Sequence, residues 1–183
     1  MGLIEQSKEL MQERTEKNKA PAWPLTEIAV EKGRELAKRY DVDEELIISA
    51  LYLAHTVFDP IWKGEIQKNH HHLSANYVKV YLDKWGVDQS DQNIIINAIE
   101  AHSGQIETET REAEIVKNAE CYKFITKKGA QIYFEELKKR GETEEEAKKK
   151  VIIKMEQKRK LLTLPECIEE ANVNCIQIEE IFK

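Results

Sequence analysis

Residues 46–58 read LIISALYLAHTVF, and apolar side chains fall on nearly every face of the helix that this stretch would form. A helix that is apolar all round is buried on every side when it belongs to a water-soluble protein. Asp41, followed three residues later by Glu44, indicates a capping box at the start of this helix. The stretch therefore predicts a central buried helix, around which the rest of the chain packs.

Helical periodicity continues outward from this stretch on both sides, and no segment shows the apolar alternation of a strand. The expected helices cover residues 3–19, 25–40, 69–86, a segment that starts after Asp88, a segment around 115–122, the charged stretch 135–160 with a capping box at Thr143 and Glu146, and a last segment from Thr163. For 69–86 the predicted buried stripe is Leu73, Tyr77, Val80, Tyr81 and Trp85. The fold class is all-α, with residues 1–183 forming a single domain.

Composition narrows the class of protein. The 183 residues carry a net charge of −6, and no apolar run approaches the roughly 20 residues of a membrane span. Three cysteines without Cys-x-x-Cys spacing indicate reduced packing residues rather than a disulfide framework. Lysines and glutamates alternate along residues 138–160, which is typical of an exposed helical hairpin with spaced ion pairs. We expect a soluble cytoplasmic protein without a membrane partner, and we do not expect nucleic-acid binding.

All five histidines lie in one window, at positions 55, 70, 71, 72 and 102. Helical spacing places His55, His70 and His102 on inward faces, each at one end of its helix, whereas His71 and His72 are predicted to face solvent. A single inward histidine is usually a hydrogen-bonded core residue. Three together suit a divalent transition metal such as zinc, nickel or manganese. The sequence leaves both alternatives open: no cofactor, or one such metal at these three residues.

Five segments in this order carry a resemblance to a known family. They are WPLTEIAVEKGRELAKRY (23–40), DVDEELIISALYLAHTVFD (41–59), NHHHLSANYVKVYLDKWG (69–86), IIINAIEAHSG (94–104) and EAEIVKNAECY (112–122). Their succession resembles the HD domain superfamily of metal-dependent phosphohydrolases, and it is most similar to the small stand-alone members. The resemblance implies an HD-domain-like helical bundle with extra N- and C-terminal helices, with its core at residues 23–126 and a C-terminal helical extension at residues 127–183.

The resemblance also implies positions for the metal ligands, and most of these positions have lost them. In the family an early histidine, a His-Asp pair and a late aspartate hold the metal. These ligands fall on Leu25, on His55 with Thr56, and on Asn118. Two further histidines, which two-metal members add, match His70 and His102. Without carboxylates at these positions, binding of Mg²⁺ or Mn²⁺ is expected to be severely weakened.

Two functions follow from this degenerate pattern. The first is a catalytically impaired HD-fold protein, retained as a ligand-binding or interaction module that recognises a nucleotide or another phosphate-containing small molecule. The second is an active metal-dependent phosphohydrolase with a rebuilt histidine-rich metal centre. In the second case Asp59 or Glu65 would supply a carboxylate, or His55, His70 and His102 would hold zinc alone. The amphipathic faces of the terminal helices suit a homo-oligomer and intramolecular packing equally well.

Overall fold

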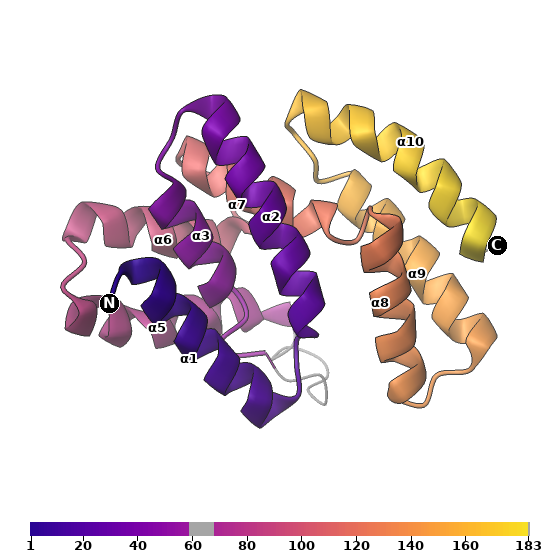
Figure 1. The fold of residues 1–183 in the computed structure, drawn as a ribbon, viewed down its shortest axis with the longest axis horizontal. Coiled ribbons are helices and arrows are strands. Elements are labelled where there is room, and N and C mark those ends of the chain that lie inside the picture. The colour runs from indigo at the N-terminus through magenta and orange to yellow at the C-terminus, as the bar shows by residue number, and fades with distance from the viewer. Residues whose placement is uncertain (59–67, 183) are drawn as a thin grey trace.

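A computed structural model describes residues 1–58 and 68–182, and it confirms the all-α fold class. Within these residues the chain forms helices and no strand (Figure 1). The helices are α1 (Leu3–Asn18), α2 (Trp23–Tyr40), α3 (Glu44–Leu53), α5 (His70–Trp85), α6 (Gln89–Ala101), α7 (Arg111–Tyr122), α8 (Lys127–Lys139), α9 (Glu144–Arg159) and α10 (Pro165–Phe182). None of the described helices combines the length and the apolar character that a membrane crossing requires.

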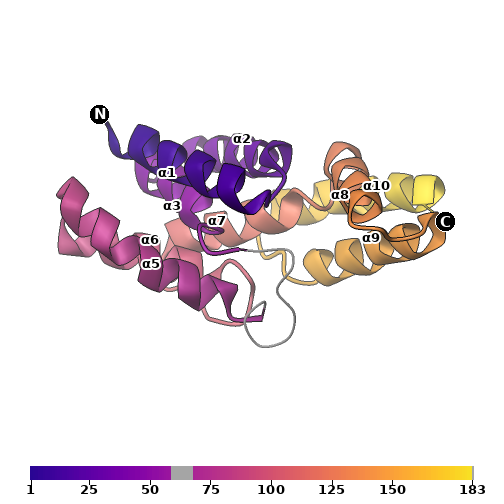
Figure 2. The same cartoon turned by 90° about the horizontal axis from the view of Figure 1, so that it is seen from below.

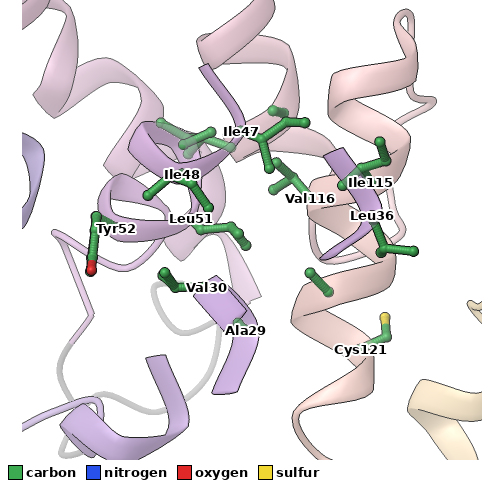
Figure 3. Packing of buried hydrophobic residues seen from close by; sticks show 14 of the residues in the cluster. Ala29, Val30, Leu36, Ile47, Ile48, Leu51, Tyr52, Ile115, Val116 and Cys121 are labelled. Carbon is green, nitrogen blue, oxygen red and sulfur yellow. The ribbon is translucent and has the colours of Figure 1, made fainter. Parts of the chain in front are cut away.

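The central helix is α3, as residues 46–58 predict. Every residue from Leu46 to Leu53 is buried, and α1, α2, α6 and α7 pack around it. Figure 3 shows Ile47, Ile48 and Leu51 in one cluster with apolar side chains of α2 and of α7. Gly33 of α2 allows a close approach here, because a Cβ at this position would lie 2.4 Å from Leu51 Cδ1.

Both ends of α3 differ from the prediction. The helix begins after Asp43, whose side chain accepts hydrogen bonds from the backbone of Glu45 and Leu46. Asp41 instead ends α2 in a left-handed conformation with φ 52°, so the capping box predicted at Asp41 is wrong. At the other end α3 stops at Leu53, and residues 54–57 form turns that carry His55.

The buried face of α5 is shifted by about one residue from the predicted stripe. Leu73 and Val80 are 38% and 64% exposed. The buried side chains are His71, Ser74, Ala75, Val78 and Leu82. Tyr77, Tyr81 and Trp85 form a partly buried row along the edge of α5. The prediction that Leu73 and Val80 are buried is therefore wrong.

The C-terminal helices α8, α9 and α10 pack against one another beside the α1–α7 bundle (Figures 1 and 2). The capping box of Thr143 and Glu146 at the start of α9 is confirmed. The last helix begins at Pro165, slightly later than predicted, and the three cysteines are free and buried, as predicted. Helix α8 contacts α2, and α7 contacts both α9 and α10. These contacts bring residues of the C-terminal extension next to the carboxyl end of α7.

Candidate metal centre

His55, His70 and His102 come together at the ends of three helices. His55 lies in the turn after α3, His70 is the first residue of α5, and His102 directly follows α6. Each offers one ring nitrogen, and these three atoms all lie within 4.8 Å of one another. The ring centroids of His55 and His102 are 4.8 Å apart, and those of His70 and His102 are 5.2 Å apart. The structure thus confirms that these three histidines form one cluster that could hold a metal ion.

The distance between the two closest rings fits ligation of one ion. Nε2 of His70 lies 3.2 Å from Nε2 of His102. Two nitrogens that share a tetrahedral zinc ion, with bonds of about 2.0–2.1 Å, lie about 3.3 Å apart. The imidazoles of His70 and His102 therefore already have the spacing that such an ion needs.

His102 is held in the tautomer that a metal requires. Its Nδ1 donates a hydrogen bond to the carbonyl oxygen of Ile99 over 2.6 Å, so that Nε2 of the neutral ring carries the free lone pair. Burial, followed by the charge of His55, lowers the pKa of His102 well below its usual value. Burial also lowers the pKa of His55, although Glu120 acts in the opposite direction. Both rings are thus neutral near pH 7, which is the form that binds metals.

Glu120 is a residue of this centre that the sequence interpretation did not include. Its Oε2 lies 2.7 Å from Nε2 of His55 and 2.7 Å from Nζ of Lys123, and its side chain is only 2% exposed. Burial acts to raise the pKa of Glu120, but the charges of Lys123 and His55 bring it well below its usual value. Its Oε1 has no hydrogen-bond partner among the described residues. A buried carboxylate with one free oxygen is a suitable metal ligand beside three imidazoles.

A sequence signal for Glu120 does exist. It lies between Ala119 and Cys121 inside the buried stripe of α7, where an acidic residue is rarely found without a partner. It also lies two residues after Asn118, the position assigned to the late aspartate of the family. A shift of two residues in that assignment would have placed a carboxylate in the site.

The three positions that appeared to have lost their ligands have other roles. Leu25 is an apolar residue of α2 that is 5% exposed. Thr56 is fully buried, and its hydroxyl donates to the carbonyl oxygen of Leu53 over 3.0 Å. Asn118 joins α7 to the turn before α10: its Oδ1 accepts from the backbone N–H groups of Thr163 and Leu164, and its Nδ2 donates to the carbonyl oxygen of Glu114 and to Thr163 Oγ1. Asp59 and Glu65, the carboxylates named as replacements, lie outside the described residues.

The prediction for the two remaining histidines is wrong for His71. Its side chain is buried, and its ring centroid lies 5.7 Å from that of His70 and 6.5 Å from that of His102. The cause is the rotation of α5 described above, which turns position 71 inward. His72 is half-buried, and its Nδ1 lies 3.0 Å from a carboxylate oxygen of Glu100.

A surface hollow of about 430 Å³ opens beside the centre. It is lined by residues Gly104, Gln105, Ile106, Glu107, Thr108, Lys117 and Leu161. The first of these follows His102 by two positions, but none of the three clustered histidines lines the hollow. It is therefore distinct from the candidate metal centre.

No protein family matches the chain, and neither does any curated protein or any solved structure.

Proposed function

We propose that this protein binds one divalent transition-metal ion and acts on a phosphate ester as a metal-dependent phosphohydrolase of the HD type. The observation that carries the proposal is the cluster of His55, His70 and His102. The buried carboxylate of Glu120 lies beside it, 2.7 Å from Nε2 of His55. This carboxylate favours the active alternative, because the loss of acidic ligands was the reason to expect impaired catalysis. The resemblance of residues 23–122 to the HD superfamily supports the choice of a phosphate ester as the substrate.

The donor set selects the class of ion. Three neutral imidazoles and one carboxylate suit zinc, nickel or manganese, whereas magnesium prefers a site built from oxygen ligands. When bound, such an ion acts as a Lewis acid on a phosphoryl oxygen and lowers the pKa of water toward neutrality. Ile99 orients His102, and Lys123 holds Glu120 as a carboxylate. The hollow beside the centre offers room for the organic part of an ester.

One observation favours the second candidate, a binding module without catalysis. Nζ of Lys123 lies 3.3 Å from Nε2 of His55 and 2.7 Å from Oε2 of Glu120. An ammonium group in this position supplies a fixed positive charge to the same two ligands that would hold the metal. If Lys123 replaces the ion, the centre would bind a phosphate group without hydrolysing it.

The experiment measures metal and turnover on the same samples. Full-length protein without a polyhistidine tag is incubated with Zn²⁺, Ni²⁺, Mn²⁺ or Co²⁺, desalted, analysed for metal content, and assayed on a panel of phosphomonoesters, a phosphodiester and nucleotides. We expect about one ion per chain and hydrolysis with at least one metal. His102→Ala should lose both, whereas His72→Ala is the matched control because His72 lies outside the cluster, and it should lose neither. Metal without turnover would support the binding module, and no retained metal would overturn the metal centre.

A further inference from the structure

Helix α9 of the C-terminal extension carries two kinds of lysine. Lys148 pairs with Glu144 over 3.0 Å, and Lys150 pairs with Glu142, so the charges in the first half of the helix are balanced. Lys154 and Lys158 follow further along the helix. Both are partly buried, and over the described part of the chain neither forms an ion pair with a carboxylate.

Lys154 contacts the same aromatic ring as Lys123, a residue of the candidate metal centre. Its Nζ lies 5.0 Å from the centroid of the Phe124 ring, and Nζ of Lys123 lies 5.4 Å from the same centroid. Lys123 in turn contacts both Glu120 and His55. The Phe124 ring thus contacts one ammonium group that belongs to the centre and one that comes from α9.

Lys158 faces the same way. It lies four residues after Lys154, and side chains with this spacing share one face of a helix. Its positive charge is among the causes that lower the pKa of Lys154. Contact between α7 and α9 places this face of α9 against the carboxyl end of α7.

The resulting group of positive charges is not balanced by the protein. Lys123 is neutralised by Glu120, but Lys154 and Lys158 repel each other at a spacing where like charges are destabilising. Burial, followed by the charges of Lys158 and Lys123, lowers the pKa of Lys154 to about 8. A bound metal ion would add further positive charge at the same place. An anion that binds between α9 and the centre would offset this repulsion.

We propose that Lys154 and Lys158 form a phosphate-binding subsite at the edge of the candidate metal centre. The C-terminal extension would then complete the site by holding a phosphate group of the ligand, and α9 would select compounds with highly charged phosphate groups. Phosphate suits this place because ammonium groups bind it as compact point charges. As an account of substrate choice the subsite rests on the proposed function, but its ability to bind phosphate can be tested without turnover.

Titration calorimetry with inorganic phosphate tests the subsite on the full-length protein, once loaded with zinc and desalted and once treated with EDTA. We expect the double variant Lys154→Gln with Lys158→Gln to weaken phosphate binding by about tenfold or more in both preparations. The matched control is Lys149→Gln, which removes the same charge from an exposed position of α9 and should change binding by less than about twofold.

Two further measurements keep the outcome clear. The zinc content of the double variant should equal that of the unmodified protein, so a failure of the metal centre and a failure of the subsite give different results. If the protein retains no zinc but the double variant still weakens phosphate binding, the subsite stands and the metal proposal fails.

Without phosphate, the Tm of Lys154→Gln should stay unchanged or rise, because a repulsive charge is removed. Equal weakening by Lys149→Gln, unaltered binding in the double variant, no phosphate binding by the unmodified protein, or a clear fall in Tm would each overturn the subsite.

Discussion

The described residues include two lysine–glutamate pairs in which the lysine is buried, and the two pairs look alike in isolation. Lys123 and Glu120 lie in the candidate metal centre, and Lys32 of α2 pairs with Glu170 of α10 where the C-terminal helices meet the bundle. In both pairs the nitrogen lies 2.7 Å from the carboxylate oxygen, and the lysine side chain is 3% exposed or less. Their surroundings, however, are opposite.

The charges around Lys32 are balanced. Burial acts to lower the pKa of Lys32, but hydrogen bonds to Glu170 and Glu35 more than offset this and raise it above its usual value. Its Nζ also lies 4.5 Å from the centroid of the Tyr122 ring, and the Tyr122 hydroxyl donates to Glu170. Each polar group of this pair therefore has a partner, which is typical of a structural contact.

The charges around Lys123 are not balanced. Burial lowers the pKa of Lys123 below its usual value despite Glu120, and the nearby Lys158 acts in the same direction. Oε1 of Glu120 has no partner among the described residues. The comparison teaches that a buried ion pair by itself says little about function. An excess of positive charge beside a free carboxylate oxygen and a cluster of three imidazoles is what points to a ligand.

The largest expected effect is on the stability of the metal-free protein. Glu120→Gln would leave Lys123 buried without a counter-charge, and breaking a buried pair in this way costs about 3–5 kcal/mol of unfolding free energy. Urea denaturation in the presence of EDTA measures this loss. The double variant Glu120→Gln with Lys123→Met removes both charges and should recover more than half of it. A loss below about 1 kcal/mol in the single variant would contradict the idea that buried Lys123 depends on Glu120 as its counter-charge.

The second effect distinguishes the two lysine–glutamate pairs by how the stability of their variants responds to zinc. Zn²⁺ at 100 times its dissociation constant should raise the unfolding free energy by about 2.7 kcal/mol, because the ion binds the folded state alone. Thermal denaturation with and without the ion measures the increase. The same increase should occur in Glu170→Gln and should be absent in His102→Ala. An undiminished increase in His102→Ala would show that the ion binds elsewhere.

The third effect concerns the balanced pair. Glu170→Gln should cost about 1 kcal/mol at pH 7, which is a small value because the Glu170 side chain is 39% exposed and therefore screened by solvent. Burial acts to raise the pKa of Glu170, but hydrogen bonds from Lys32 and Tyr122 lower it below the ordinary 4.5.

The sign of the pH dependence follows from that lowered pKa. The stabilisation by Glu170 is complete above the ordinary pKa, and it disappears as the pH falls through the lower pKa of the folded state. The unfolding free energies of Glu170→Gln and the unmodified protein should therefore differ at pH 7 and converge in acid. Urea titrations along a pH series check this, and a difference that grows in acid would reverse the assignment.

Sequence patterns predicted the positions of the helices more accurately than they predicted which face of each helix is buried. The apolar residues of α3 define a buried helix whatever its rotation, so its place in the centre could be predicted. For α5 the apolar positions are spread over two adjoining faces, and a shift of one residue turns His71 inward and Leu73 outward. Only the packing of Ala75 and Val78 against the neighbouring helices decides between these faces.

The candidate site was predicted in part for the same reason. His55, His70 and His102 could be brought together because each lies at a helix end next to a loop. Glu120 and Lys123 were missed, since a salt bridge between positions three apart on a helix resembles an ordinary surface pair in the sequence. The lysines of α9 were interpreted as part of a solvated hairpin, and only the contact between α7 and α9 distinguishes Lys154 and Lys158 from their neighbours.

The smallest expected effect tests whether the two pairs are independent. Tyr122→Phe removes the hydroxyl that donates to Glu170 but keeps the ring beside Lys32, so it should cost about 0.5 kcal/mol of unfolding free energy, at the low end for a hydrogen bond because Glu170 is partly exposed. The pKa of Tyr122 is raised to about 12, mainly by burial, and the hydroxyl is therefore a donor throughout the neutral range. Combined with Glu170→Gln, the substitution should cost less than the sum of the two single changes, because both remove the same hydrogen bond.

Tyr122 follows Glu120 by only two positions on α7, yet its side chain faces α2 and α10, so the zinc content of Tyr122→Phe should equal that of the unmodified protein. A loss of zinc in this variant would mean that the balanced pair also positions the metal ligands, and that the two pairs form a single network.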